Sequence, residues 1–178
     1  MSVKHGLLAL LTEGPRYGYE LKAQFEARTG QTWPLNIGQV YTTLGRLEQD
    51  GLVTRDGENA EGQVHYSLTS RGRREVDDWW AMAVPREAPA RDELAIKLAL
   101  AISVPGVDVP AVLQRQRTAT LSALQTHTRR RTAMRAADPD DTASELVLES
   151  LVFAAEAEVR WLDHCEARLL RSRNGASR

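Results

Sequence analysis

The chain has 178 residues, of which 42% are hydrophobic and 26% are charged, and its net charge at pH 7 is −1. A chain of this size and composition can bury a hydrophobic core in one or two domains, which excludes wholesale disorder. The balanced charge argues against a protein held on nucleic acid by bulk positive charge, but it allows a locally positive face.

The cysteine content and the apolar runs indicate where the protein works. Cys165 is the single cysteine, so no intramolecular disulfide can form and a reducing compartment is expected. The N-terminus lacks the basic-then-apolar pattern of a signal peptide. The longest apolar run, 94–102, is interrupted by Lys97 and is too short to span a bilayer. We therefore expect a soluble, cytoplasmic protein with no membrane partner.

Three short helices are predicted over the first fifty residues. The first starts near Val3 and ends at 12–15, because glycine followed by proline cannot continue a helix. The second opens within 17–21. The third begins after Asn36, whose side chain can cap it, and ends at Gly51, which adopts positive φ without steric cost. Three short helices joined by brief turns indicate a helix-turn-helix unit.

The third helix has two chemically different faces. Its apolar residues recur at helical spacing and are Ile37, Val40, Leu44 and Leu47. Its polar residues are Gln39, Thr42, Thr43 and Arg46. Such side chains can hydrogen-bond to base edges and phosphates, although a solvated surface helix would look the same.

A change of period after Gly51 predicts a β-hairpin. The segments 52–55 and 63–68 read as strands around a polar tip at 56–62 that contains two glycines. Thr69 then caps a further helix. The resulting winged helix-turn-helix domain is predicted over residues 1–81, followed by a proline-containing linker at 82–91.

The remainder of the chain is predicted to be helical. Periodicity resumes at 92–103, and Pro110 suits the first turn of a long helix that runs to about Arg135. A capping box at 142–145 starts the final helix, which is expected to reach about Arg171. The predicted fold is therefore mainly α with a small β-hairpin, with a helical domain over 92–171 and a frayed tail at 172–178.

Several linked motifs resemble the PadR family of bacterial transcriptional regulators. They are Tyr-Gly-Tyr-Glu-Leu at 17–21, the whole of 39–53, and Tyr-Ser-Leu-Thr at 66–69 followed by Gly72. In the second half, 92–98 and 157–163 resemble the C-terminal helical region of longer members. The resemblance implies a homodimeric repressor that binds an inverted-repeat operator in double-stranded DNA and is released by a small molecule. Thr42 departs from the family, where many members have proline.

The resemblance also implies roles for individual residues. Tyr41 can pack its ring in the core while its hydroxyl contacts a phosphate, and Lys22 can supply charge without sequence information. The expected DNA-binding residues are Tyr19, Lys22, Asn36, Gln39, Tyr41, Thr42, Thr43, Arg46, Asn59, Gln63 and His65.

An effector site and a dimer interface are expected beyond the recognition helix. Trp79 and Trp80 point about 100° apart on a helix, so one is expected in the core while the other is the candidate to face a cavity near the C-terminal helices. A core or interface role is favoured for the pair over contact with a ligand. The effector would be a small aromatic or hydrophobic molecule. In the family, the last helix pairs with its mate and with the N-terminal helix. The expected dimerisation residues are Leu7, Leu11, Val147, Leu151, Ala154, Trp161, Cys165 and Leu169.

Other function classes find less support in the sequence. It has no Ser-His-Asp order, no glycine-rich phosphate loop and no zinc signature, so we expect no enzyme, no cofactor and no metal site. Two alternatives stay open: a winged helix that binds another protein, and a MarR-type regulator. The latter builds its dimer from both chain ends, whereas here the C-terminal half supplies most of the helices.

Overall fold

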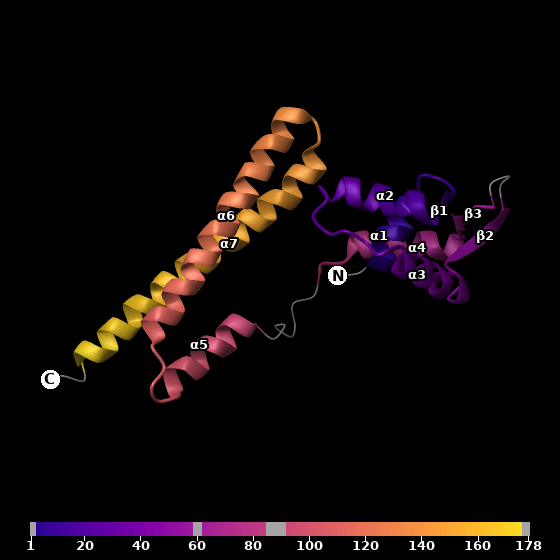
Figure 1. The fold of residues 1–178 in the computed structure, drawn as a ribbon. Helices are drawn as coiled ribbons and strands as arrows, with labels where there is room; N and C mark the ends of the chain where they lie inside the picture. Colours follow the sequence, from indigo (N-terminus) through magenta and orange to yellow (C-terminus); the bar gives the residue numbers. More distant parts are fainter. Residues whose placement is uncertain (1–2, 59–61, 85–91, 176–178) are drawn as a thin grey trace. The chain divides into compact units, whose positions relative to one another are not determined.

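The chain divides into two compact units. The computed structural model describes residues 3–58, 62–84 and 92–175, and the units are Met1–Pro85 and Arg86–Arg178. Figure 1 shows a unit of short helices with a small sheet and a unit dominated by two long helices.

The N-terminal unit is a winged helix-turn-helix. Its elements are α1 (Val3–Leu11), β1 (Arg16–Tyr17), α2 (Gly18–Arg28), α3 (Ile37–Gln49), β2 (Val53–Glu58), β3 (Val64–Leu68) and α4 (Ser70–Ala81). The predicted helices and hairpin are confirmed, but the sheet has a third strand. Tyr17 pairs with His65 in the antiparallel order β1-β3-β2, so the segment expected to open a helix begins with an edge strand of the sheet.

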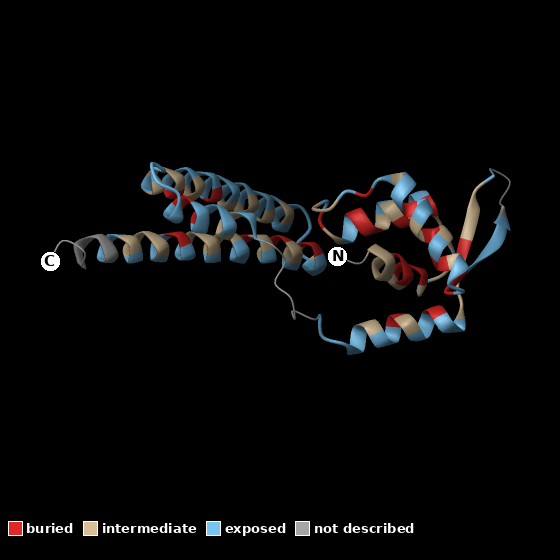
Figure 2. Cartoon of the chain, turned by 90° about the horizontal axis from the view of Figure 1, so that it is seen from below, coloured by how far each residue is buried: buried red, intermediate tan, exposed pale blue. Residues whose placement is uncertain are grey.

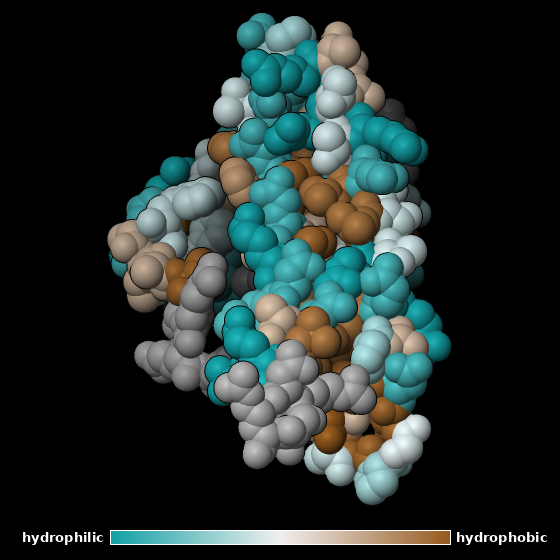
Figure 3. Space-filling view, turned by 90° about the vertical axis from the view of Figure 1, so that its left-hand side faces the viewer, coloured by the Kyte–Doolittle hydropathy of each residue, from teal (hydrophilic) through white to brown (hydrophobic). Residues whose placement is uncertain are grey.

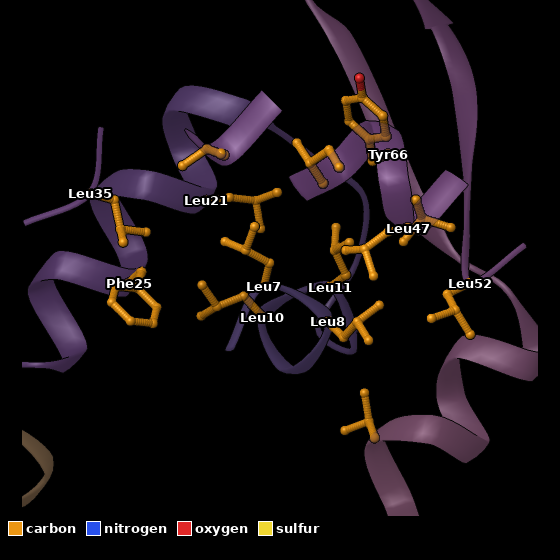
Figure 4. Close-up of a cluster of buried hydrophobic side chains, with 14 residues drawn as sticks. Leu7, Leu8, Leu10, Leu11, Leu21, Phe25, Leu35, Leu47, Leu52 and Tyr66 are labelled. Carbon is orange, nitrogen blue, oxygen red and sulfur yellow. The ribbon is translucent and has the colours of Figure 1, made fainter. Parts of the chain in front are cut away.

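The core of this unit is built around α1 (Figure 4). Leu7, Leu8 and Leu11 are at most 2% exposed, and they lie among side chains from α2, α3 and the sheet. Leu7 and Leu11 were expected at a dimer interface, and this expectation is wrong. Side chains buried this deeply inside their own unit have no surface left for a second chain.

The base of the wing depends on a close contact at Gly72. Thr69 caps α4 by accepting from the Gly72 N–H at 3.0 Å, and its hydroxyl donates to the Gly51 carbonyl at 2.8 Å. A Cβ on Gly72 would lie 2.0 Å from the Leu52 carbonyl oxygen. Only glycine lets α4 approach the start of β2 this closely, so this residue fixes the wing against the helices.

The C-terminal unit is a pair of long helices with a shorter one against it. α5 (Glu93–Ser103), α6 (Val109–Ala137) and α7 (Thr142–Gly175) pack around Leu98, Leu113 and Leu162. Figure 2 shows the buried positions as short red bands among exposed and intermediate ones on these helices. The predicted capping box at the start of α7 is replaced by Asp141, whose carboxylate accepts from the Ser144 N–H at 3.1 Å. Within the described residues, every helix is too short or too polar to cross a lipid bilayer.

The buried face of α7 differs from the face that carries the expected dimer residues. Its buried residues are Leu148, Val152 and Leu162, with Ser144. The expected dimer residues Cys165 and Leu169 pack instead against the Leu98–Leu113–Leu162 cluster of their own chain. The face turned toward α6 is therefore rotated by about one residue, roughly 100°, from the face that carries the expected dimer residues.

The outward side of α7 carries large apolar side chains. Leu146 is 60% exposed, Phe153 63% and Trp161 37%, and their spacing places them on one side of the helix. Of the expected dimer residues, Val147 and Leu151 are half-buried, whereas Ala154 and Trp161 are exposed. Figure 3 shows hydrophobic patches among hydrophilic side chains on the side of the molecule that it displays.

Candidate nucleic-acid interface

Helix α3, the third predicted helix and the candidate DNA-recognition helix, begins after Asn36 as the sequence predicts. The Asn36 side-chain oxygen accepts from the Gly38 N–H at 2.8 Å, so it caps the helix while remaining at the surface. Residues 36–47 contain no aspartate or glutamate. The free N–H groups and the macrodipole make this end of α3 favourable for an anion such as a phosphate.

The inward face of α3 holds it firmly in the unit. Val40, Leu44 and Leu47 are at most 1% exposed and belong to the core cluster, and Ile37 packs against that cluster while half-buried. Burying each of these three aliphatic side chains stabilises the folded state by about 1.5–3 kcal/mol, so together they contribute several kcal/mol to holding α3 in place. This burial leaves the opposite face of α3 free to contact a partner.

The outward face carries the polar residues expected to read bases. Gln39, Thr42 and Arg46 are exposed, whereas Thr43 is half-buried. The Thr42 and Thr43 hydroxyls each donate to the carbonyl four residues earlier, at 2.8 Å. Their oxygens can therefore still accept hydrogen bonds, and Gln39 and Arg46 supply donors. This set fits the donor and acceptor edges of base pairs in a major groove.

Tyr41 lies where α3 meets the N-terminus of α2. A Cβ on Gly18 would lie 2.6 Å from Cζ and 2.7 Å from Cε1 of Tyr41, so the ring occupies the space that Gly18 leaves empty. Tyr19 meets the same ring edge-on, with centroids 6.3 Å apart. Burial, together with the nearby Tyr19, Tyr66 and Tyr17, raises the pKa of Tyr41. Tyr19 is 60% exposed and Tyr41 41% exposed, so both rings are accessible to a ligand.

Lys22 has a structural partner in addition to any role at a phosphate. Its ammonium lies 2.7 Å from a Glu26 carboxylate oxygen, and the same oxygen accepts from the Leu35 N–H at 2.8 Å. Glu26 is buried, and these donors lower the pKa of its carboxyl group. The Lys22–Glu26 pair thus anchors the segment that leads into α3, and a phosphate would have to share Lys22 with Glu26.

The wing is the β2–β3 hairpin, and the structure describes only some of the wing residues that are expected to contact DNA. His65 meets Tyr17 edge-on, with centroids 5.6 Å apart, and both His65 and Gln63 are half-buried. Asn59 lies outside the described residues. Arg55 on β2 pairs with Glu48 of α3 at 2.9 Å, which joins the wing to the C-terminal turn of the recognition helix.

Two family models match consecutive parts of the chain. The transcriptional regulator PadR-like family model matches residues 7–78, and the virulence activator alpha C-terminal model matches residues 90–169. The chain therefore carries a PadR-like family domain followed by a virulence activator alpha C-terminal domain. The two matches correspond closely to the two compact units, and the expected family and fold are confirmed.

Known relatives support the same assignment. The negative transcriptional regulator PadR of Bacillus subtilis is 30% identical over 99 residues, which is 53% of this chain and 54% of that protein, so the match spans about half of its length. A Mycobacterium tuberculosis protein, Rv1176c, described as a probable transcriptional regulator, is 27% identical over 92% of this chain and 95% of its own.

Solved structures share the fold of this PadR-like chain. Bacillus subtilis PadR in complex with operator DNA superposes with a TM-score of 0.70 at 23% identity, over 93% of this chain and 97% of that one. The same protein in complex with p-coumaric acid gives a TM-score of 0.71, again at 23% identity and with the same coverage of both chains.

The two adjacent tryptophans of the PadR-like chain differ in their surroundings. Trp79 is half-buried and stacks on His5, with centroids 5.4 Å apart and planes 5° from parallel. His5 and Lys4 both contact the Glu75 carboxylate, at 3.2 and 2.7 Å, and they lower the pKa of Glu75. Trp80 is 66% exposed and lies against the Trp79 ring at 4.3 Å. Trp80 is therefore the one of the pair with surface available to a ligand.

The sequence reasoning missed the glycines of this interface. Gly18 stands between two tyrosines, and that Tyr-Gly-Tyr pattern was a usable signal that a ring packs across the gap. Gly45 lies inside the recognition helix, where a glycine is unfavourable unless something requires it.

Proposed function

We propose that the chain is a sequence-specific DNA-binding transcriptional regulator that acts as a homodimer. The observation that carries this proposal is the outward face of α3, which has no acid between residues 36 and 47 and presents Gln39, Thr42 and Arg46 beside the wing. Polar side chains of this kind on a firmly packed helix suit a major groove.

Repression is the favoured direction of regulation. The Bacillus subtilis relative is named as a negative regulator, and its structure with operator DNA has the fold of this chain. We infer that two recognition helices of a dimer read an inverted repeat, with half-sites about 34 Å apart, one turn of duplex.

The dimer is proposed to form through the outward side of α7. Leu146, Phe153 and Trp161 lie on one side of this helix and are exposed in the single chain. Exposed apolar side chains aligned along a helix gain free energy when a second helix covers them. A second copy of the chain, with the same exposed residues, is the occupant that this symmetry favours.

A small aromatic or hydrophobic effector is proposed to release the DNA. The support is the exposed Trp80 ring beside Trp79, together with the p-coumaric acid complex of the Bacillus subtilis relative. An aromatic molecule could stack on Trp80 without displacing the Trp79–His5 contact.

A gel-shift experiment tests the DNA-binding proposal. The DNA directly upstream of the protein's own coding sequence should give a discrete shift that unlabelled copies of the same fragment remove and unrelated DNA of equal length does not. Arg46→Ala with Tyr41→Phe should weaken that shift while the circular dichroism spectrum is unchanged. A wild-type shift that unrelated DNA removes as well as the unlabelled upstream fragment does, or no shift at all, would refute the proposal.

A further inference from the structure

Gly45 occupies an unfavourable position for a glycine. It lies in the middle of α3, between the fully buried Leu44 and the exposed Arg46. Glycine destabilises a helix interior relative to alanine because it loses more backbone freedom on folding. Gly45 therefore lowers the stability of the recognition helix relative to alanine, and its presence calls for a structural or functional reason.

The unit itself offers no steric reason for this glycine. A Cβ on Gly45 would meet no atom within 4 Å among the described residues, and Gly45 has the ordinary negative φ of a helix. Gly6, Gly18 and Gly72 differ, because a Cβ there would lie within 2.8 Å of Phe25, Tyr41 and Leu52 respectively. Each of those glycines is explained by contacts inside the unit.

The direction of Gly45 points to a reason outside the unit. At about 100° per residue, Gly45 lies roughly 100° to 160° around α3 from the buried residues Leu44, Val40 and Leu47. It lies much closer to the line of Gly38 and Thr42. Arg46 and Tyr41 flank it. A side chain at residue 45 would therefore project from the face proposed to enter the groove.

We propose that Gly45 determines how closely the α3 backbone approaches the DNA. Without a Cβ at this position, the α3 backbone can lie close enough to the duplex for the short side chains of Thr42 and its neighbours to reach base edges. A side chain would hold the helix away and lengthen those contacts beyond hydrogen-bonding range. This inference rests on the proposed DNA-binding function.

Gly45→Ala provides a test in which stability and binding move in opposite directions. The substitution should raise the melting temperature of the N-terminal unit by roughly 4–8 °C, because helix propensity improves and nothing clashes. The affinity for the upstream DNA fragment should fall by at least about 10-fold, as measured by fluorescence anisotropy. Gln49→Ala, one turn further along the same side, is the matched control and should retain wild-type affinity.

The possible results separate this inference from the proposed function. If wild type and Gln49→Ala bind the upstream DNA specifically and Gly45→Ala binds equally well, the role of Gly45 is refuted and DNA binding stands. A Gly45→Ala protein that melts at a lower temperature would assign the glycine to the fold and also refute the inference. If wild type binds no DNA specifically, both ideas fail.

Discussion

At the scale of single residues, the contact between Gly18 and Tyr41 joins the two helices that form the proposed interface. The Tyr41 ring fills the space above Gly18, so Gly18→Ala must displace either the ring or the N-terminus of α2. We predict that Gly18→Ala lowers DNA affinity by about 10-fold or more, with the secondary structure retained. Fluorescence anisotropy gives the affinity, and circular dichroism checks the fold.

A double-mutant cycle separates this steric effect from a general loss of stability. In a Tyr41→Ala background the ring is gone, so adding Gly18→Ala should change the affinity by less than about 2-fold. An equal loss in both backgrounds would show that Gly18 acts independently of Tyr41, contrary to this account.

Glu26 makes the segment before α3 sensitive to acid. Lys22 and the Leu35 N–H lower the pKa of its carboxyl from the ordinary value of 4.5, so its contribution to stability is complete above that value. This contribution is lost as the pH falls through the lowered pKa of the folded state. We predict that chemical denaturation between pH 6 and 3 shows a flatter pH dependence of unfolding free energy for Glu26→Gln than for wild type. Identical profiles would contradict this role.

At the scale of elements, the signals that were local in sequence gave correct predictions. Asn36 and Thr69 cap α3 and α4 as expected, because a cap involves residues two or three positions apart. The strand β1 was missed, since its two residues form a strand only by pairing with β3, about fifty positions later. No local pattern marks such a short partner.

The face of α7 was misjudged for a related reason. Apolar residues occur on several sides of this helix, so periodicity could not tell which side packs on α6 and which is exposed. Leu148, Val152 and Leu162 are buried, and Leu146 and Phe153 are exposed. The choice depends on where the side chains of α6 lie, and that information is in the tertiary structure.

The outward side of α7 carries the prediction about assembly. Phe153→Glu places a charge in the proposed interface, and burying an unpaired carboxylate is strongly unfavourable. We expect the dimer dissociation constant to rise by about 100-fold or more in sedimentation experiments. Leu170→Glu, an exposed leucine on another side of α7, is the control and should leave the dimer intact. A Phe153→Glu protein that sediments as wild type would exclude this interface.

The end of α4 carries the prediction about the effector. Trp80 is exposed, whereas Trp79 is held by His5, so Trp80→Ala should preserve folding and DNA binding. We predict that p-coumaric acid or a similar aromatic acid releases wild-type protein from DNA at a concentration at least about 10-fold lower than it needs for Trp80→Ala. Equal release of the two proteins would place the effector elsewhere.

At the scale of the whole molecule, both halves of the chain match family models, and the resemblance seen in the sequence extends across both units. Motif order and spacing were sufficient to identify the family and the fold. The proposed dimer contacts are harder to assign from sequence, because the spacing of Leu7 and Leu11 does not tell whether they face their own core or a second chain, and the structure buries both in their own unit.

The effect of Arg46→Ala on binding to specific and scrambled DNA tests the central claim, that α3 reads a base sequence, most directly. With an inverted repeat taken from the upstream DNA fragment, the logarithm of the wild-type binding constant should fall linearly with the logarithm of salt concentration, because Lys and Arg release counterions from phosphates. Arg46→Ala should weaken binding to this repeat by about 10- to 100-fold, and should weaken binding to a scrambled repeat far less. If Arg46→Ala weakened both DNAs equally, or neither, α3 would not be reading the sequence.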